Sequence, residues 1–173
     1  RRGAAMSATF VGIGRDAVLL GVNRQGTQAL GDRPFVFTRI AGPVSVAEPM
    51  RRELTAIVRL LAGVFRVRGL ASLDFLLEGD RIEVLELNPR PPASIVLYPR
   101  VGEGGPLTAH LRACERDELP TLLKLYRADK FLLDKIAASV TSFLEEVRSD
   151  PKHSFRDEVD RILLALPDKL AHD

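Results

Sequence analysis

The chain has 173 residues, of which 46% are hydrophobic and 28% are charged, a balance typical of a globular domain with a core of its own. The net charge of +2 is too small to indicate a nucleic-acid or acidic-membrane partner, no apolar run has the length of a membrane span, and the first residues do not contain the apolar core of a secretory signal. A single cysteine excludes an internal disulfide framework, so we expect a cytoplasmic protein.

Two antiparallel strands are predicted at the start of the chain. Residues 6–14 and 17–23 are largely apolar, and a turn at residues 14–16 joins them. Residues 12–17 formally match the glycine pattern of dinucleotide-binding sites, but they lead into a strand and not a helix, so we interpret them as a turn. A third strand is predicted at residues 34–40.

A long amphipathic helix is predicted from Ser45 or Glu48 to Arg66. Ser45 and Glu48 have the spacing of a capping box, and Pro49 suits a first helical turn. One apolar stripe follows the helix, and Glu53 is expected to fall away from it. The stripe consists of Met50, Leu54, Ile57, Val58, Leu61, Val64 and Phe65.

The stretch from residue 69 to residue 98 carries the chemistry. Two apolar runs flank Gly79 and Asp80, which predicts a β-hairpin. Each run contains a carboxylate where a buried strand favours an apolar residue, Asp74 in the first run and Glu86 in the second. A carboxylate in such a position needs a cation or a hydrogen-bond donor beside it.

The length of the turn decides whether the two carboxylates meet, because side chains alternate between the faces of a strand. A three-residue turn at residues 79–81 places Asp74 opposite Glu86. A two-residue turn places Asp74 opposite Leu85 and sends Glu86 to the other face. A shared metal site therefore predicts a turn of odd length or a bulge.

Asn88 and Arg90 follow the second run in the sequence Asn-Pro-Arg-Pro-Pro. Asp74, Glu86 and Asn88 offer only oxygen ligands, which Mg²⁺ prefers. Arg90 is a permanently charged, forked donor suited to a phosphate or acyl-phosphate oxygen, and the prolines restrict the backbone around it. The alternative is a hairpin with carboxylates at a solvated edge, but the Glu-x-Asn-Pro-Arg run favours a binding site.

The pattern Gly-x-x-x-x-Asp-Phe, a short turn and Leu-Glu-x-Asn-Pro-Arg resembles the metal-binding strand pair of the ATP-grasp superfamily, and above all its carboxylate-amine ligase branch. The resemblance implies that Asp74, Glu86 and Asn88 hold Mg²⁺, or Mn²⁺, on the phosphates of ATP. It also implies that Arg90 contacts the γ-phosphate or acyl-phosphate as the catalytic residue. The resemblance is strong over residues 69–98, looser over residues 2–119, and absent afterwards.

The remaining elements complete an α+β fold, an antiparallel sheet with helices packed on one face, followed by a helical tail. Residues 93–98 are predicted as a strand or a short helix, and residues 107–116 as a helix in which Cys114 is structural. All 13 glycines precede residue 106, and the first lysine is Lys124. We therefore predict an ATP-grasp-like C-terminal subdomain at residues 1–119 and a helical hairpin at residues 120–173.

Two functions from different classes follow. The resemblance implies part of an ATP-dependent carboxylate-amine or related ligase that works through an acyl-phosphate, with ATP and a small carboxylate as its partners. In that family an earlier subdomain supplies a phosphate-binding lysine, so we expect this chain alone to be incomplete and inactive; a missing N-terminal half and a homo-oligomer both stay open. The alternative is a non-catalytic ATP-grasp-like binding or assembly module.

Overall fold

The computed structural model describes residues 2–99, 101, 102, 104–120, 140, 141, 143–145 and 149. The chain divides into two compact units, residues 1–123 and 124–173. In the second unit the described residues are helical, and Val140, Phe143 and Leu144 are buried. The rest of the helical hairpin predicted for residues 120–173 lies outside the described residues. No helix in the described part of the chain is long and apolar enough to cross a membrane.

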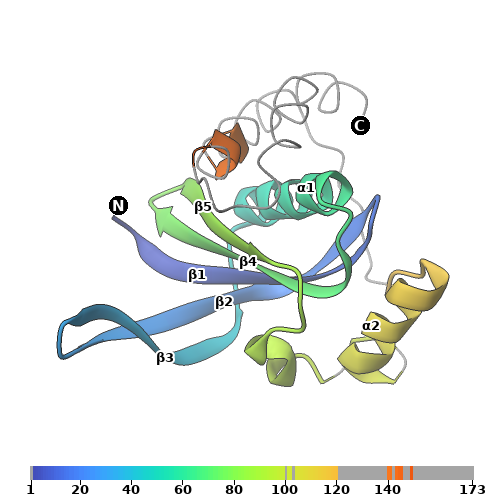
Figure 1. Ribbon diagram of the computed structural model, residues 1–173, viewed down its shortest axis with the longest axis horizontal. Coiled ribbons are helices and arrows are strands. Elements are labelled where there is room, and N and C mark those ends of the chain that lie inside the picture. The colour runs from blue at the N-terminus through green and yellow to red at the C-terminus, as the bar shows by residue number, and fades with distance from the viewer. Residues whose placement is uncertain are drawn as a thin grey trace. The chain divides into compact units, whose positions relative to one another are not determined.

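The first unit is built on a five-stranded sheet in the order β3-β2-β1-β4-β5 (Figure 1), and its neighbouring strands are antiparallel. The strands are β1 (Ala4–Ile13), β2 (Ala17–Leu30), β3 (Arg33–Val44), β4 (Arg68–Glu78) and β5 (Arg81–Asn88). The turn predicted between the first two strands is confirmed, since the Ile13 amide donates to the Asp16 carbonyl at 2.9 Å. This turn joins two strands, so the glycine pattern there has no helix to support a dinucleotide.

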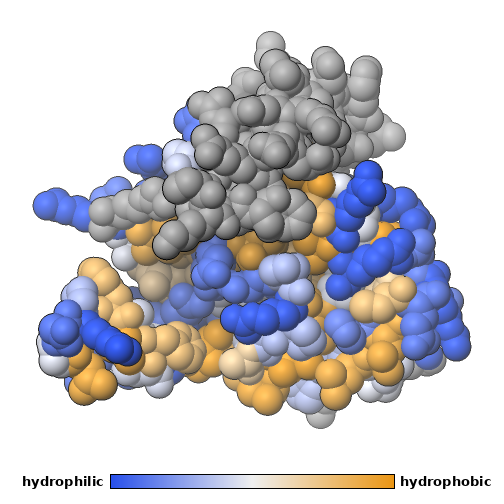
Figure 2. Space-filling model, in the orientation of Figure 1, coloured by the Kyte–Doolittle hydropathy of each residue, from blue (hydrophilic) through white to orange (hydrophobic). Residues whose placement is uncertain are grey.

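The β2–β3 hairpin is longer than predicted. The pairing of β1 with β2 starts at Met6 and Arg24, so the rest of β2 pairs with β3 alone. Figure 1 shows this hairpin extending past the other strands, and Figure 2 shows hydrophobic surface at its far end. Leu30, Phe35 and Phe37 are exposed there. Because the far end of β2 buries neither face, its sequence lacks the alternation from which strands are predicted.

Helix α1 (Glu48–Val64) covers one face of the sheet through its predicted apolar stripe. Ala47 is its N-cap residue and no side chain among the described residues caps it, so the predicted capping box at Ser45 is wrong, although Pro49 does occupy the first turn. The expectation for Glu53 is also wrong, because its side chain is only 1% exposed. Glu53 lies one turn before Ile57 and so shares a flank with the stripe.

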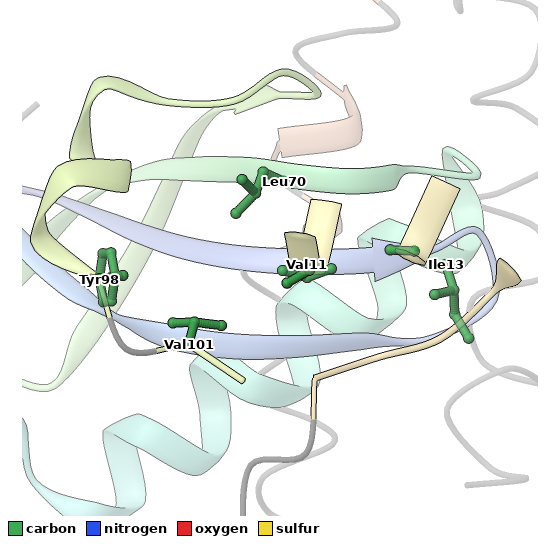
Figure 3. Close-up of a cluster of buried hydrophobic side chains, with 7 residues drawn as sticks. Val11, Ile13, Leu70, Tyr98 and Val101 are labelled. Atoms are coloured by element: carbon green, nitrogen blue, oxygen red, sulfur yellow. The ribbon is translucent and has the colours of Figure 1, made fainter. Parts of the chain in front are cut away.

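The opposite face of the sheet is covered by η1 (Ala93–Leu97) and α2 (Gly105–Arg116). Val11, Ile13 and Leu70 of the sheet pack with residues from this segment (Figure 3). The segment contributes Tyr98, Val101, Ala109 and Ala113 to the cluster. The α+β class is confirmed, and the helices lie on both faces and not on one. The small alanines of α2 allow close packing without the large apolar stripe that reveals a core helix in a sequence.

Candidate metal and phosphate site

The β4–β5 hairpin brings the two predicted carboxylates together by a bulge. Glu78 pairs with Arg81, so the turn has two residues, and of the two predicted alternatives, a turn of odd length or a bulge, the structure has the bulge. Phe75 pairs with Val84 and Asp74 pairs with Glu86, which leaves Leu85 as an extra residue in β5. An extra residue of this kind reverses the face of the side chains that follow it. Asp74 and Glu86 consequently occupy opposite positions on one face of the sheet.

Asp74 is half-buried, and both of its carboxylate oxygens accept hydrogen bonds from amides. Its Oδ1 accepts from Gln25 Nε2 at 2.9 Å, and its Oδ2 accepts from Asn88 Nδ2 at 3.3 Å. Burial raises the pKa of Asp74, and the negative charge of Glu86 raises it further. The bond from Gln25, the charge of Arg90 and the bond from Asn88 oppose that rise. The carboxyl group therefore occupies an environment in which added positive charge is favourable.

Asn88 and Arg90 lie at the end of β5 beside this pair. Asn88 pairs with Ser72, two residues before Asp74 in β4, so its side chain is on the same face as the carboxylates. The Arg90 amide donates to the Asn88 carbonyl at 2.9 Å, which closes a tight turn around Pro89. Arg90 is exposed, and its guanidinium acts electrostatically on Asp74. The structure thus brings together all four residues that the sequence analysis singled out.

These side chains suit a hard divalent cation. Two facing carboxylates and one amide supply oxygen donors, and Mg²⁺ prefers such donors together with water and phosphate oxygens. Within the described residues there is no group of three or more histidine, cysteine, aspartate or glutamate side chains placed to hold a metal ion. The set described here has two carboxylates, and its third member is an amide. A site of this composition leaves coordination positions for the phosphates of a nucleotide.

A buried polar network lies beside the site and fixes the segment that follows Arg90. Asn23 is fully buried; its Nδ2 donates to Thr9 Oγ1 at 3.0 Å and its Oδ1 accepts from the Tyr98 hydroxyl at 2.7 Å. Thr9 Oγ1 and Ser94 Oγ share a hydrogen bond of 2.7 Å. Burial raises the pKa of the Tyr98 phenol, which keeps it protonated as a donor. Ser94 and Tyr98 therefore attach η1 to the sheet at two points.

Asn23 and Gln25 were not among the predicted site residues. Both lie within β2, and their spacing of two residues puts them on one face. Two amides on one face of a strand, in line with the carboxylates, are a signal that could have been found. Their partners could not be predicted without the strand order, because β1 lies between β2 and β4.

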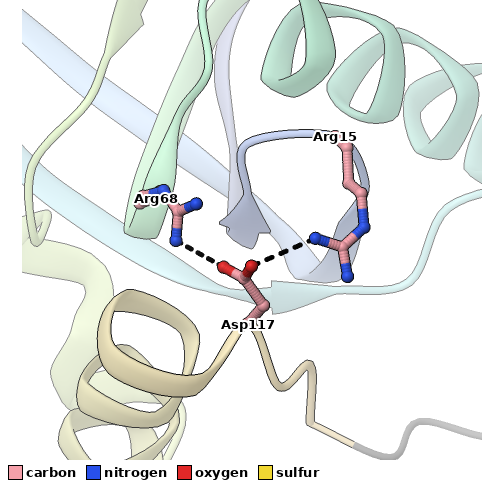
Figure 4. A network of polar contacts seen from close by, with 3 residues as sticks. All are labelled: Arg15, Arg68 and Asp117. Atoms are coloured by element: carbon pink, nitrogen blue, oxygen red, sulfur yellow. Dashed lines mark hydrogen bonds and ion pairs between the residues drawn. The ribbon is translucent and has the colours of Figure 1, made fainter.

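A second polar cluster joins three elements away from the candidate site (Figure 4). Asp117, which follows α2, accepts hydrogen bonds from Arg15 in the β1–β2 turn, at 3.1 Å, and from Arg68 at the start of β4. These two arginines lower the pKa of Asp117, the bond from Arg15 being the largest cause. All three side chains have partners within the cluster, which indicates a structural role.

Comparisons with known proteins bear on the family and the fold of this chain. The ATP-grasp domain family matches residues 2–94, more than half of the chain. N5-carboxyaminoimidazole ribonucleotide synthetase in complex with ADP has a TM-score of 0.53 and 19% identity, over 70% of this chain and 32% of that one. This likeness shows a shared fold. No curated protein matches the chain.

Two further solved structures are similar over parts of the chain. For phosphoribosylglycinamide synthetase from Anaerococcus prevotii the TM-score is 0.48 and the identity 14%, over 56% of this chain and 24% of that one. For the biotin carboxylase domain of a single-chain bacterial carboxylase the TM-score is 0.47 and the identity 13%, over 99% of this chain and 58% of that one. This chain thus spans between a quarter and three fifths of the three solved structures.

Proposed function

Because this chain belongs to the ATP-grasp family, we propose that it supplies the metal-holding part of the ATP site in an ATP-dependent ligase of the carboxylate-amine or a related type. The observation that carries this proposal is the register of the β4–β5 hairpin. Asp74 and Glu86 face each other there, and Asn88 lies on the same face and bonds to Asp74. Bulges also occur in hairpins that bind no ligand. In this hairpin the bulge brings the three oxygen donors to one face.

The proposed roles follow from the position of each side chain. Asp74, Glu86 and Asn88 would hold Mg²⁺, or Mn²⁺, which supplies charge shielding and orientation for the phosphates of ATP. Asp74 is half-buried and held by two amides, so it is the fixed ligand, whereas the exposed Glu86 is free to adjust to the nucleotide. The bond from Asn88 Nδ2 to Asp74 leaves Asn88 Oδ1 as the acceptor that faces a cation.

Arg90 is the proposed catalytic residue. In the reaction, an oxygen of a small carboxylate substrate attacks the γ-phosphorus of ATP, and the bond to the β–γ bridging oxygen breaks to release ADP. An amine or another nucleophile then attacks the acyl carbon of the acyl-phosphate and releases inorganic phosphate. The exposed guanidinium of Arg90 would contact the oxygens of the transferring phosphoryl group and stabilise their charge. The Asn88–Arg90 turn and the attachment of η1 fix the backbone on both sides of this arginine.

A second candidate function, a non-catalytic binding or assembly module of the same fold, is favoured by one observation. The first lysine of this sequence is Lys124, which follows the sheet and all the helices described in the first unit. A module of this kind would retain the fold without phosphoryl transfer. Measuring ADP formation distinguishes the two candidates.

The test is Mg²⁺-dependent ADP formation by the complete enzyme of which the proposal makes this chain a part, with mixtures of small carboxylates and amines. The ligase proposal predicts that Glu86→Gln lowers the rate about a hundredfold or more, since a charged ligand of the cation that shields the reacting phosphates is lost. Glu78→Gln, at the exposed end of β4, is the matched control and should leave the rate unchanged. A protein that binds nucleotide but forms no ADP under any condition would favour the module.

A further inference from the structure

Gln25 makes a contact to the candidate site from a strand that is not its neighbour. Ser7 of β1 pairs with Asn23 of β2 on one side and with Asp74 of β4 on the other. Gln25 lies two residues beyond Asn23 on the same face, so its side chain passes diagonally over β1. Its Nε2 donates to Asp74 Oδ1 at 2.9 Å. This bond ties the metal-holding hairpin to the far side of the sheet.

The contact complements the bond that Asn88 makes to the same carboxylate. Asn88 Nδ2 occupies Asp74 Oδ2 at 3.3 Å, and Gln25 Nε2 occupies Oδ1 at 2.9 Å. Because both oxygens are held, the carboxylate plane is fixed in one orientation about the Cβ–Cγ bond. An amide also achieves this without changing the charge of the site, whereas a lysine in its place would repel a cation. Asn88 belongs to the proposed ligand set, and Gln25 does not.

We propose that Gln25 is a positioning residue for the cation site, which fixes the Asp74 carboxylate in the orientation that a divalent cation needs. This inference rests on the proposed function, since it concerns the same site. Groups that hydrogen-bond to metal-binding side chains typically change metal affinity about 10- to 100-fold when they are removed. Gln25 would act in the same way, through its donor group and not through its charge or its packing.

The experiment is a titration with Mn²⁺ alone, in which electron paramagnetic resonance measures the free ion. Gln25→Leu removes the donor, and we expect its affinity for Mn²⁺ to be about 10- to 100-fold weaker than that of the wild type. Gln28→Leu is the matched control, because Gln28 is exposed on the same strand and should leave the affinity unchanged. Melting temperatures of both variants verify that they fold.

A second variant separates positioning from charge. Gln25→Glu has nearly the shape of the wild type, but its ionised side chain cannot donate, and it adds a negative charge. If affinity only followed the net charge of the site, this variant would bind Mn²⁺ more tightly. The positioning role predicts weaker binding, and binding as tight as the wild type or tighter would overturn it.

The outcomes separate this inference from the proposed function. Binding of Mn²⁺ by the wild type with unchanged binding by Gln25→Leu would overturn the role of Gln25 and leave the metal site standing. A wild-type protein that binds no Mn²⁺ would overturn the proposed function, and the role of Gln25 with it. Weaker binding by both Gln25 variants, with normal binding by Gln28→Leu, is the result that supports the inference.

Discussion

Asp74 of β4 and Glu86 of β5 lie directly opposite each other because Leu85 is an extra residue between the paired positions. If the pairing continued regularly from Glu78 and Arg81, Asp74 would face Leu85, and Glu86 would point to the other side of the sheet. The bulge returns Glu86, and Asn88 after it, to the face of Asp74. With a two-residue turn and a β5 of this length, the bulge is therefore needed to bring the three oxygen donors to one face.

Deleting Leu85 should therefore leave cation binding nearly intact. Without it, a regular ladder from the two-residue turn still pairs Asp74 with Glu86. Deleting Leu87 is the matched control, because it turns Asn88 to the other face and should weaken Mn²⁺ binding roughly tenfold or more. Circular dichroism verifies folding of both variants. Loss of binding on deletion of Leu85, with retention on deletion of Leu87, would contradict this account of the register.

Asp74→Asn should stabilise the protein at neutral pH while it weakens cation binding. The folded-state pKa of Asp74 is raised, so its stabilising contribution is complete below the unfolded pKa and is lost as the pH rises through the folded pKa. Asparagine lacks this dependence. We expect a higher midpoint of urea unfolding for the variant at neutral pH and a smaller difference in acid. Asp32→Asn, at the exposed β2–β3 turn, should show neither change. A lower midpoint for Asp74→Asn would refute the prediction.

Tyr98→Phe should destabilise the fold by about 1–3 kcal/mol, because Asn23 Oδ1 then stays buried without the donor that it has at 2.7 Å. The control is Thr38→Val, which removes an exposed hydroxyl bonded to the Gly26 carbonyl at 3.1 Å. That change should stay within about 0.5 kcal/mol. Urea unfolding measures the free energy of unfolding of both variants. Equal decreases would show that the buried hydrogen bond contributes no more to stability than the exposed one.

The Asp117 cluster should make stability sensitive to acid. The pKa of Asp117 is lowered in the folded state, so its stabilising contribution is present above the ordinary aspartate pKa and is lost as the pH falls through the lowered value. Asp117→Asn is a suitable variant, since Asp117 has a φ of 56° and asparagine tolerates this left-handed conformation. The melting temperature of the wild type should exceed that of the variant at neutral pH, and the two should converge in acid. A constant difference at every pH would argue against this linkage.

The carboxylates of the site were predictable because charge inside an apolar strand is unusual and needs an explanation. Asp74 and Glu86 interrupt two apolar runs, and the Asn-Pro-Arg sequence follows at once. The sequence predicts that a shared site needs either a turn of odd length or a bulge. It does not locate the bulge, since it is compatible with a turn of two or of three residues. Only the pairing of Phe75 with Val84 identifies Leu85 as the extra residue.

The residues that escaped prediction depend on the order of the strands. Gln25 meets Asp74 across β1, and Asn23 meets Tyr98 across 75 positions of the chain. Local periodicity contains no information on such contacts. The helix at α2 was predicted, but the face of the sheet that it covers was not. Ala109 and Ala113 pack against the sheet without forming a large apolar stripe.

The most direct test of the metal site is the affinity of the purified protein for Mn²⁺, measured by electron paramagnetic resonance in the wild type, Glu86→Gln and the control Glu78→Gln. We expect the wild type and Glu78→Gln to bind the ion equally and Glu86→Gln to bind it more than about tenfold more weakly. Equal binding by all three proteins, or no binding by the wild type, would contradict the assignment of Asp74, Glu86 and Asn88 to a cation site.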